Sequence, residues 1–278
     1  MNLPEFNKIP DAVAIDLDGT LLNTELQVSE RNRMAIGKCI ASGIPVVIAT
    51  ARAARSVHRV LGVKLASICS LVCTNGAVAR AAPPLAGEIR EEIPPAVVSD
   101  IIRSVLEIEP NVLILIELDG EEFGTNMPRD PEELWRINSA TPDMQLSLED
   151  ALDGNPAKVL VDGLGRKLVA VAERISEKFC DFVAVVPSDE MTLLNIIGIN
   201  ASKPNALRKL LGSSQISLDN VVAFGDDIPD IEMLQQCGIP VAMANAIPEV
   251  KEICSYQTAS NDDDGVAIVL EKILELVR

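Results

Sequence analysis

The chain has 278 residues, of which 48% are hydrophobic, and its 41 acidic and 24 basic side chains give a formal net charge of −17. This length accommodates one large or two ordinary domains, and the apolar fraction can fill a core of that size. The negative charge argues against broad contact with nucleic acid or with an anionic membrane surface. An anionic substrate would therefore need local basic residues or a metal ion.

Residue usage narrows the location of the protein and its chemistry. No apolar run approaches the roughly 20 residues of a membrane span, and the first ten residues lack a signal-peptide pattern, so we expect a cytoplasmic protein. The six cysteines include no CxxC pair, which predicts buried thiols in a reducing compartment. His58 is the single histidine, which nearly excludes a multi-histidine metal site or a Ser-His-Asp triad. Acid–base chemistry is left to carboxylates or lysine.

Short β-branched segments alternate with helical patterns at the start of the chain, which is typical of βαβ units around a parallel sheet. The predicted elements are a buried strand at 11–16, a helix at 29–42, and further buried strands at 44–49 and 70–74. Ser29 can cap the helix and Gly43 can end it. Asn75-Gly76 predicts a turn directly after the third strand.

From about residue 81 a proline-rich connector leads into a second set of elements. We expect helices at 96–108 and 166–179 and strands at 111–118, 157–162, 182–186 and 192–197. The first alternation then returns, with strands at 220–225 and 239–244 and helices at 228–237 and 268–277. The sequence therefore predicts an α/β fold in which residues 1–79 and 199–278 form a Rossmann-like, doubly wound parallel sheet, and residues 80–198 form an inserted α/β cap domain.

Two carboxylates one residue apart, Asp16 and Asp18, follow the first predicted strand. If the strand continues that far, both side chains point to one face, and ligands of open parallel sheets bind beyond this end of the strands. The alternative is an ordinary turn at Asp18-Gly19, capped by Asp16. Polar residues also follow the other strands: Thr50, Arg52, Asn75, Asp226, Asp227 and Asp230. Such clustered carboxylates repel one another without a cation, and oxygen ligands suit Mg²⁺.

Four segments in order carry a resemblance to a known family: DLDGTLL at 16–22, IATAR at 48–52, Lys203 in NASKPNAL, and GDDIPDIEML at 225–234. They resemble the four motifs of the haloacid dehalogenase superfamily. More narrowly, the chain is similar to the Cof-type phosphatases of that superfamily, which carry a large α/β cap inserted after the third strand. TNGA at 74–77, MANA at 243–246 and TASNDDDGVA at 258–267 are also similar to the pattern of that subfamily.

The sequence departs from the usual motifs at Ala51, Pro204, Pro229 and Ala244. We expect alanine to be accepted at 51 and 244 if the backbone has a negative φ there. Pro229 removes a side-chain amide that such enzymes use around the metal. Metal affinity, or the geometry around the metal, is therefore where this chain should differ from the family.

The resemblance implies a Mg²⁺-dependent phosphatase that hydrolyses a small phosphorylated metabolite through an aspartyl-phosphate. In this mechanism Asp16 is the nucleophile, and Asp18 protonates the leaving alcohol and then activates water, which requires a raised pKa of Asp18. The implied metal-site residues are Asp16, Asp18 through its backbone carbonyl, Asp226, and Asp230, which ligates a metal-bound water or orients Lys203. Thr50 and Lys203 bind phosphate, while Asn75 and Arg52 are further substrate-binding candidates. Arg52 could instead pair with a core carboxylate.

A sugar phosphate is the expected substrate, followed by phosphorylated cofactors such as pyridoxal phosphate or flavin mononucleotide. Cap residues that could contact it are Glu117, Asp119, Glu121, Arg129, Trp135, Arg136 and Asp189. One alternative is a phosphomutase, which passes the phosphoryl group to a second hydroxyl. Another is a non-catalytic binding protein on the same fold, which Pro204 and Pro229 would suit. The sequence leaves open whether the protein is a monomer or a dimer.

Overall fold

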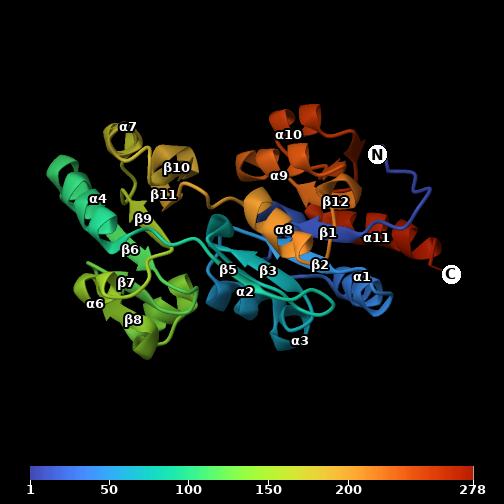
Figure 1. Cartoon of the computed structure of the whole chain (residues 1–278), viewed down its shortest axis with the longest axis horizontal. Coiled ribbons are helices and arrows are strands. Elements are labelled where there is room, and N and C mark those ends of the chain that lie inside the picture. The colour runs from blue at the N-terminus through green and yellow to red at the C-terminus, as the bar shows by residue number, and fades with distance from the viewer. Residues whose placement is uncertain (278) are drawn as a thin grey trace. The chain divides into compact units, whose positions relative to one another are not determined.

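The computed structural model describes residues 1–277 and divides into two compact units. The first, the core unit, comprises Met1–Ala51, Val57–Ile89 and the described residues from Ser202 onward. The second, the cap unit, comprises Arg52–Ser56 and Arg90–Ala201. Figure 1 labels most of the helices and strands of both units.

The core unit is built on an eight-stranded sheet in the order β14-β13-β12-β1-β2-β3-β4-β5. The strands are β1 (Ala12–Ile15), β2 (Val46–Ala49), β3 (Ser70–Cys73), β4 (Val78–Arg80), β5 (Glu88–Arg90), β12 (Val221–Gly225), β13 (Ile239–Ala242) and β14 (Tyr256–Gln257). Pairing is parallel from β14 to β3, and β4 joins β3 antiparallel. Strands β1, β2, β3 and β12 are buried along their whole length, as their continuous apolar sequences require.

Helices on the two sides of the core sheet cover these apolar strands. They are α1 (Glu30–Ala41), α2 (Ala54–Leu61), α3 (Val63–Ala66), α8 (Lys203–Gly212), α9 (Ile231–Gln236), α10 (Pro248–Ile253) and α11 (Gly265–Glu275). The predicted cap of α1 is present, because the Ser29 side chain accepts a hydrogen bond from the Asn32 amide at 3.1 Å. Helix α1 packs against α11, and α9 contacts both α8 and α10 (Figure 1).

The direction of winding reverses between β1 and β12. From β1 the chain proceeds outward to β2 and β3, whereas from β12 it proceeds the opposite way to β13 and β14. Right-handed crossovers then place α1 and α9 on opposite faces of the sheet. A doubly wound sheet opens a crevice at this reversal, beyond the carboxyl ends of the two central strands. Asp16 and Asp226, which directly follow β1 and β12, lie at that point.

The cap unit has a six-stranded sheet in the order β10-β11-β9-β6-β7-β8, antiparallel except between β7 and β8. Its strands are β6 (Leu113–Glu117), β7 (Phe123–Thr125), β8 (Gln145–Ser147), β9 (Lys158–Asp162), β10 (Val183–Ser188) and β11 (Leu193–Gly198). Its helices are α4 (Pro95–Ile108), α5 (Pro131–Glu133), α6 (Leu148–Leu152) and α7 (Val169–Lys178). A core that includes Ile101, Ile114 and Val159 joins α4, α6 and α7 to the sheet.

A buried ion pair ties Arg52–Ser56 into the cap unit. Arg55 Nη1 and Nη2 donate to the two carboxylate oxygens of Glu117 at 2.7 and 2.8 Å, and Arg55 Nε donates to the Asn138 carbonyl at 3.0 Å. Both side chains are almost fully buried. The Glu117 carboxylate, a predicted substrate contact, is therefore engaged within its own unit.

The α/β fold class, with a doubly wound parallel sheet and an inserted α/β unit, is confirmed. The bounds of the two units differ from the predicted 1–79 and 199–278 against 80–198. Residues 80–89 stay with the core unit because β4 extends the core sheet, with Leu71 of β3 opposite Arg80. Within residues 1–277, none of the helices combines the length and the apolar character that crossing a bilayer requires.

Candidate functional site

Asp16 and Asp18 would share one face only if the first strand continued to Asp18, and this condition is not met, because β1 ends at Ile15. Asp16 is 5% exposed, and its amide donates to the Phe224 carbonyl of β12 at 3.1 Å. The chain then turns away through Gly19, which has a φ of +74°. The side chain of Asp18 is exposed as a result.

Gly19 brings this turn against Asp226. A Cβ atom at Gly19 would collide with the Asp226 carboxylate, and its positive φ is one that residues with side chains rarely adopt. The neighbouring Thr20 donates from Oγ1 to Asp226 Oδ1 at 2.8 Å. The turn after β1 is therefore locked to the residue that follows β12.

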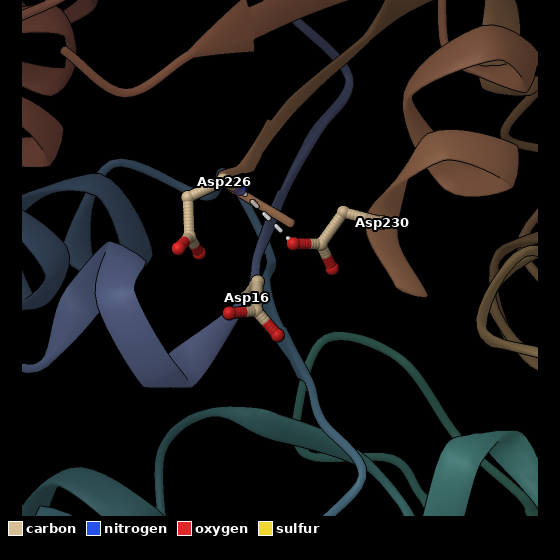
Figure 2. A group of neighbouring side chains, drawn as sticks. All are labelled: Asp16, Asp226 and Asp230. Atoms are coloured by element: carbon tan, nitrogen blue, oxygen red, sulfur yellow. Dashed lines mark hydrogen bonds between the residues drawn. The ribbon is translucent and has the colours of Figure 1, made fainter. Parts of the chain in front are cut away.

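Three carboxylates meet at the carboxyl ends of these central strands. Asp16, Asp226 and Asp230 each offer one carboxylate oxygen, and these oxygens lie within 4.8 Å of one another. Figure 2 draws the three side chains together. Asp230 ends the short turn Ile228–Asp230, and its Oδ2 accepts the Asp226 and Asp227 amides at 3.0 and 3.3 Å. The loop after β12 thus wraps around the Asp230 side chain.

Lys203 reaches the same carboxylates from the first turn of α8. Its buried ammonium donates to Asp16 Oδ1 at 2.6 Å and to Asp230 Oδ1 at 2.7 Å. Three carboxylates and one ammonium, with every group ionised, leave two formal negative charges in excess. Such an excess in a buried site must be met by protons or by a cation.

The pKa shifts show which groups carry this excess. Burial, together with the charge of Asp230, raises the pKa of Asp16 well above its ordinary value, although Lys203 acts in the opposite direction. Burial raises the pKa of Asp226 to about 6. For Lys203, burial alone would lower the pKa, but Asp16 and Asp230 raise it above its usual value. The lysine therefore stays charged, and the carboxylates are the groups that take a proton or a cation.

Hard oxygen donors in this arrangement fit Mg²⁺. Carboxylates and carbonyls are the ligands it prefers, and a divalent ion matches the two excess negative charges. The donor set of Asp16, Asp226 and Asp230 is the part of the predicted metal site that the structure brings together. Asp18 lies outside this carboxylate group.

Thr50 and the turn after β3 are linked through the backbone. Thr50 is buried at the end of β2, and its carbonyl accepts the Asn75 amide at 3.1 Å. Thr74, Asn75 and Gly76 have φ values of +55°, +58° and +93°. A Cβ atom at Gly76 would collide with the Ser202 carbonyl, so this left-handed turn packs against the start of α8. It therefore connects the segment that carries Thr50 with the segment that carries Lys203.

The same turn holds two polar atoms without a hydrogen-bond partner. Within the part of the chain that the structure describes, Thr74 Oγ1 and Asn75 Oδ1 are buried and unpaired. Such atoms are uncommon in folded proteins because each loses its bonds to water without replacement. They favour a polar ligand or water at this position.

Arg52 belongs to the cap unit, where its Nη1 donates to Ser56 Oγ at 3.2 Å.

The backbone conformation accepts the four residues that depart from the family motifs. Neither Ala51 nor Ala244 is among the described residues with positive φ, and Pro204 and Pro229 stand in first helical turns, where proline is tolerated.

Three residues that the structure places at this turn were not identified from the sequence: Thr20, Asn245 and Asn261. Asn245 donates from Nδ2 to the Gly19 carbonyl at 2.7 Å, and Asn261 donates from Nδ2 to the Leu22 carbonyl at 2.8 Å. Their motifs, MANA and TASNDDDGVA, were visible in the sequence. The partners of these amides become identifiable only once the chain has folded.

The match of this chain to known proteins extends well beyond the site. A family model of haloacid dehalogenase-like hydrolases matches residues 13–270. The chain belongs to this family. The predicted superfamily is thereby confirmed, and with it the assignment as a hydrolase whose relatives are named phosphatases.

Relatives of the family match over nearly their whole length. Phosphatase YwpJ of Bacillus subtilis is 30% identical, over 94% of this chain and 99% of that protein. The 5-amino-6-(5-phospho-D-ribitylamino)uracil phosphatase YwtE of the same organism is 28% identical, over 94% and 97%. A Thermotoga maritima protein of known crystal structure is 30% identical in sequence to this chain. The two structures align with a TM-score of 0.79, over 95% of this chain and 97% of that one.

Proposed function

We propose that the protein is a Mg²⁺-dependent phosphatase that hydrolyses a small phosphorylated metabolite through an aspartyl-phosphate at Asp16. The observation that carries this proposal is the Lys203 ammonium, which holds Asp16 and Asp230 beside Asp226 in one buried group. A structural ion pair would be satisfied by one carboxylate for each ammonium. The excess of acidic groups supports a site that is completed by a cation and a phosphate ester.

In the first step, a carboxylate oxygen of Asp16 attacks phosphorus, and the bond from phosphorus to the leaving oxygen breaks. Lys203 orients Asp16 for this attack by holding its Oδ1. Asp18, which is exposed at the turn, delivers a proton to the departing alcohol. In the second step Asp18 takes a proton from the water that attacks phosphorus, which frees inorganic phosphate and restores the Asp16 carboxylate.

Mg²⁺ would be held by the carboxylates of Asp16 and Asp226, the Asp18 backbone carbonyl, and Asp230, through water or directly. When bound, it neutralises charge so that an anionic carboxylate can approach an anionic phosphate. Asp230 also has its own task in this chain, because it fixes Lys203 on one side and the backbone after β12 on the other.

Thr50, Asn75 and Lys203 are the proposed phosphate and substrate contacts. Asn75 Oδ1 is a buried, unpaired acceptor, which suits a substrate hydroxyl, while its Nδ2 can donate to a phosphate oxygen. Arg52, two residues after Thr50 in the sequence, remains a substrate-binding proposal. A ligand with both a phosphate and hydroxyl groups would use these donors and acceptors fully.

A sugar phosphate or a phosphorylated cofactor or cofactor precursor is the proposed substrate class. One relative named above acts on a phosphorylated ribitylamino uracil, which combines a polyol chain and a phosphate monoester. Nucleic acid and membranes remain poor candidates because the net charge of −17 repels polyanions.

Phosphate release from a panel of esters tests the proposal. The panel contains sugar phosphates, pyridoxal phosphate, flavin mononucleotide, 5-amino-6-(5-phospho-D-ribitylamino)uracil and p-nitrophenyl phosphate, each with Mg²⁺ and with EDTA. Asp16→Asn should abolish release, whereas Asp11→Asn, at an exposed carboxylate in front of β1, should leave it unchanged.

Several outcomes would count against this function. Release that persists in Asp16→Asn, or that ignores EDTA, contradicts the mechanism. Formation of an isomerised sugar phosphate without free phosphate would instead identify a phosphomutase. The absence of turnover together with the absence of Mg²⁺ binding would favour a binding protein.

A further inference from the structure

The turn that carries Asp18 is held from outside by two asparagine side chains. Asn245 Nδ2 donates to the Gly19 carbonyl at 2.7 Å, and Asn261 Nδ2 donates to the Leu22 carbonyl at 2.8 Å. The two carbonyls lie on either side of Thr20, which bonds Asp226. Residues 19–22 are thus fixed to segments that follow β12, β13 and β14.

The two asparagines are coupled to each other. The Asn261 amide donates to Asn245 Oδ1 at 3.0 Å, so the Asn245 carboxamide is engaged at both its ends. The loops that carry them are also joined, because the Ala244 amide donates to the Ala259 carbonyl at 3.2 Å. The two asparagines are therefore linked to each other, and each bonds one backbone carbonyl of the turn.

Gly19 is the flexible position on which such a support acts. Glycine has the greatest backbone freedom of all residues, and this one stands in a left-handed conformation directly after Asp18. Asn245 itself is exposed. A bond from an exposed amide contributes little to stability because water can replace it, yet it can still select one conformation of the turn.

We propose that Asn245, supported by Asn261, is a positioning residue that fixes the Gly19 carbonyl and thereby holds Asp18 in place for proton transfer. This inference rests on the proposed phosphatase function. It assigns a task to MANA and TASNDDDGVA, the two motifs that the mechanism leaves unused. Proton transfer demands accurate placement, and a displacement near 1 Å can cost about a hundredfold in rate.

The first test compares two aryl esters that differ in leaving group. Phenyl phosphate needs a proton on its departing oxygen more than p-nitrophenyl phosphate does, because phenol is the weaker acid. In the presence of Mg²⁺, Asn245→Ala should lower kcat/KM for phenyl phosphate about ten- to a hundredfold, and that for p-nitrophenyl phosphate clearly less. Its Tm should stay within about 2 °C of wild type, as expected for an exposed side chain.

Two further variants separate positioning from general support. Asn245→Asp keeps the acceptor for the Asn261 amide but sets a carboxylate oxygen against the Gly19 carbonyl, so it should lose at least as much activity as Asn245→Ala. The matched control is Asn2→Ala, which removes a bond of the same kind, from Nδ2 to the Ser255 carbonyl at 2.9 Å, and should change neither ester. Equal losses on both esters, or wild-type activity in both Asn245 variants, would overturn the proposal.

Hydrogen exchange provides a readout that does not depend on catalysis. Peptides covering residues 17–24 should exchange faster in Asn245→Ala than in wild type, and unchanged exchange there would also overturn the proposal. If wild type releases no phosphate from any ester, the phosphatase function fails. In that case faster exchange still supports the fixing of the turn by Asn245, while the link to proton transfer is rejected.

Discussion

Lys203 Nζ donates to Asp16 Oδ1 at 2.6 Å across a sequence separation of 187 residues. Both side chains are nearly inaccessible to water, and the same ammonium bonds Asp230. A buried charge is stable only while its partners remain, because removing one partner leaves the others without compensation. We therefore expect substitutions in this buried group to change both the free energy of unfolding and phosphate release.

Replacement of the ammonium should destabilise the fold. Lys203→Met leaves Asp16 and Asp230 buried without their cation, and we expect the free energy of unfolding at pH 7 to fall by about 3–5 kcal/mol. Urea unfolding in EDTA measures this loss. Lys209→Met, at an exposed position of the same helix, should stay within about 0.5 kcal/mol of wild type, and an equal loss in both variants would contradict this account.

Metal-free protein should lose stability as the pH rises from about 4 to 7 through the contribution of Asp226. Its folded-state pKa of about 6 lies above the ordinary aspartate value of 3.8, so the folded state binds more protons in this range. The stabilisation is therefore complete below pH 4 and lost as the pH passes 6. Urea unfolding in EDTA should show Asp226→Asn flattening this decline by about 1–3 kcal/mol. A decline as steep as that of wild type would refute the assignment.

Mg²⁺ binding should strengthen with pH over the same interval. The ion must displace the proton of Asp226, and this displacement should increase the affinity by up to about tenfold per pH unit below pH 6 and contribute no further increase above it. Isothermal titration calorimetry with MgCl₂ measures the affinity directly. Asp226→Asn should weaken it strongly, whereas Asp11→Asn should not. An affinity that is constant from pH 5 to 8 would exclude this carboxylate as a ligand.

A pair of glycine substitutions tests the locked turn. Gly19→Ala introduces a Cβ that collides with Asp226 at a positive φ, so we expect a loss of about 2 kcal/mol or more, together with loss of phosphate release. Gly37→Ala meets open space inside α1 and should instead stabilise by about 0.5–1 kcal/mol. The Tm values of the two variants should therefore shift in opposite directions from that of wild type. An unchanged Tm of Gly19→Ala would show that the turn can relax.

Much of this fold can be predicted from local sequence patterns. Short apolar segments predict the buried strands, the Ser29 cap predicts the start of α1, and Asn75-Gly76 predicts the left-handed turn. The acidic and basic motif residues identify the chemistry by type and order. These features depend on neighbours a few residues away, so the sequence by itself determines them.

Tertiary structure decided which of these residues meet. The pairing of Lys203 with Asp16, the support of Gly19 by Asn245 and the burial of Arg55 against Glu117 join residues far apart in the chain. Even the neighbours Asp16 and Asp18 take different environments, because β1 ends at Ile15 and Gly19 turns the chain. Periodicity within one segment carries no information about such contacts. They follow from the strand order, which brings the ends of β1 and β12 together.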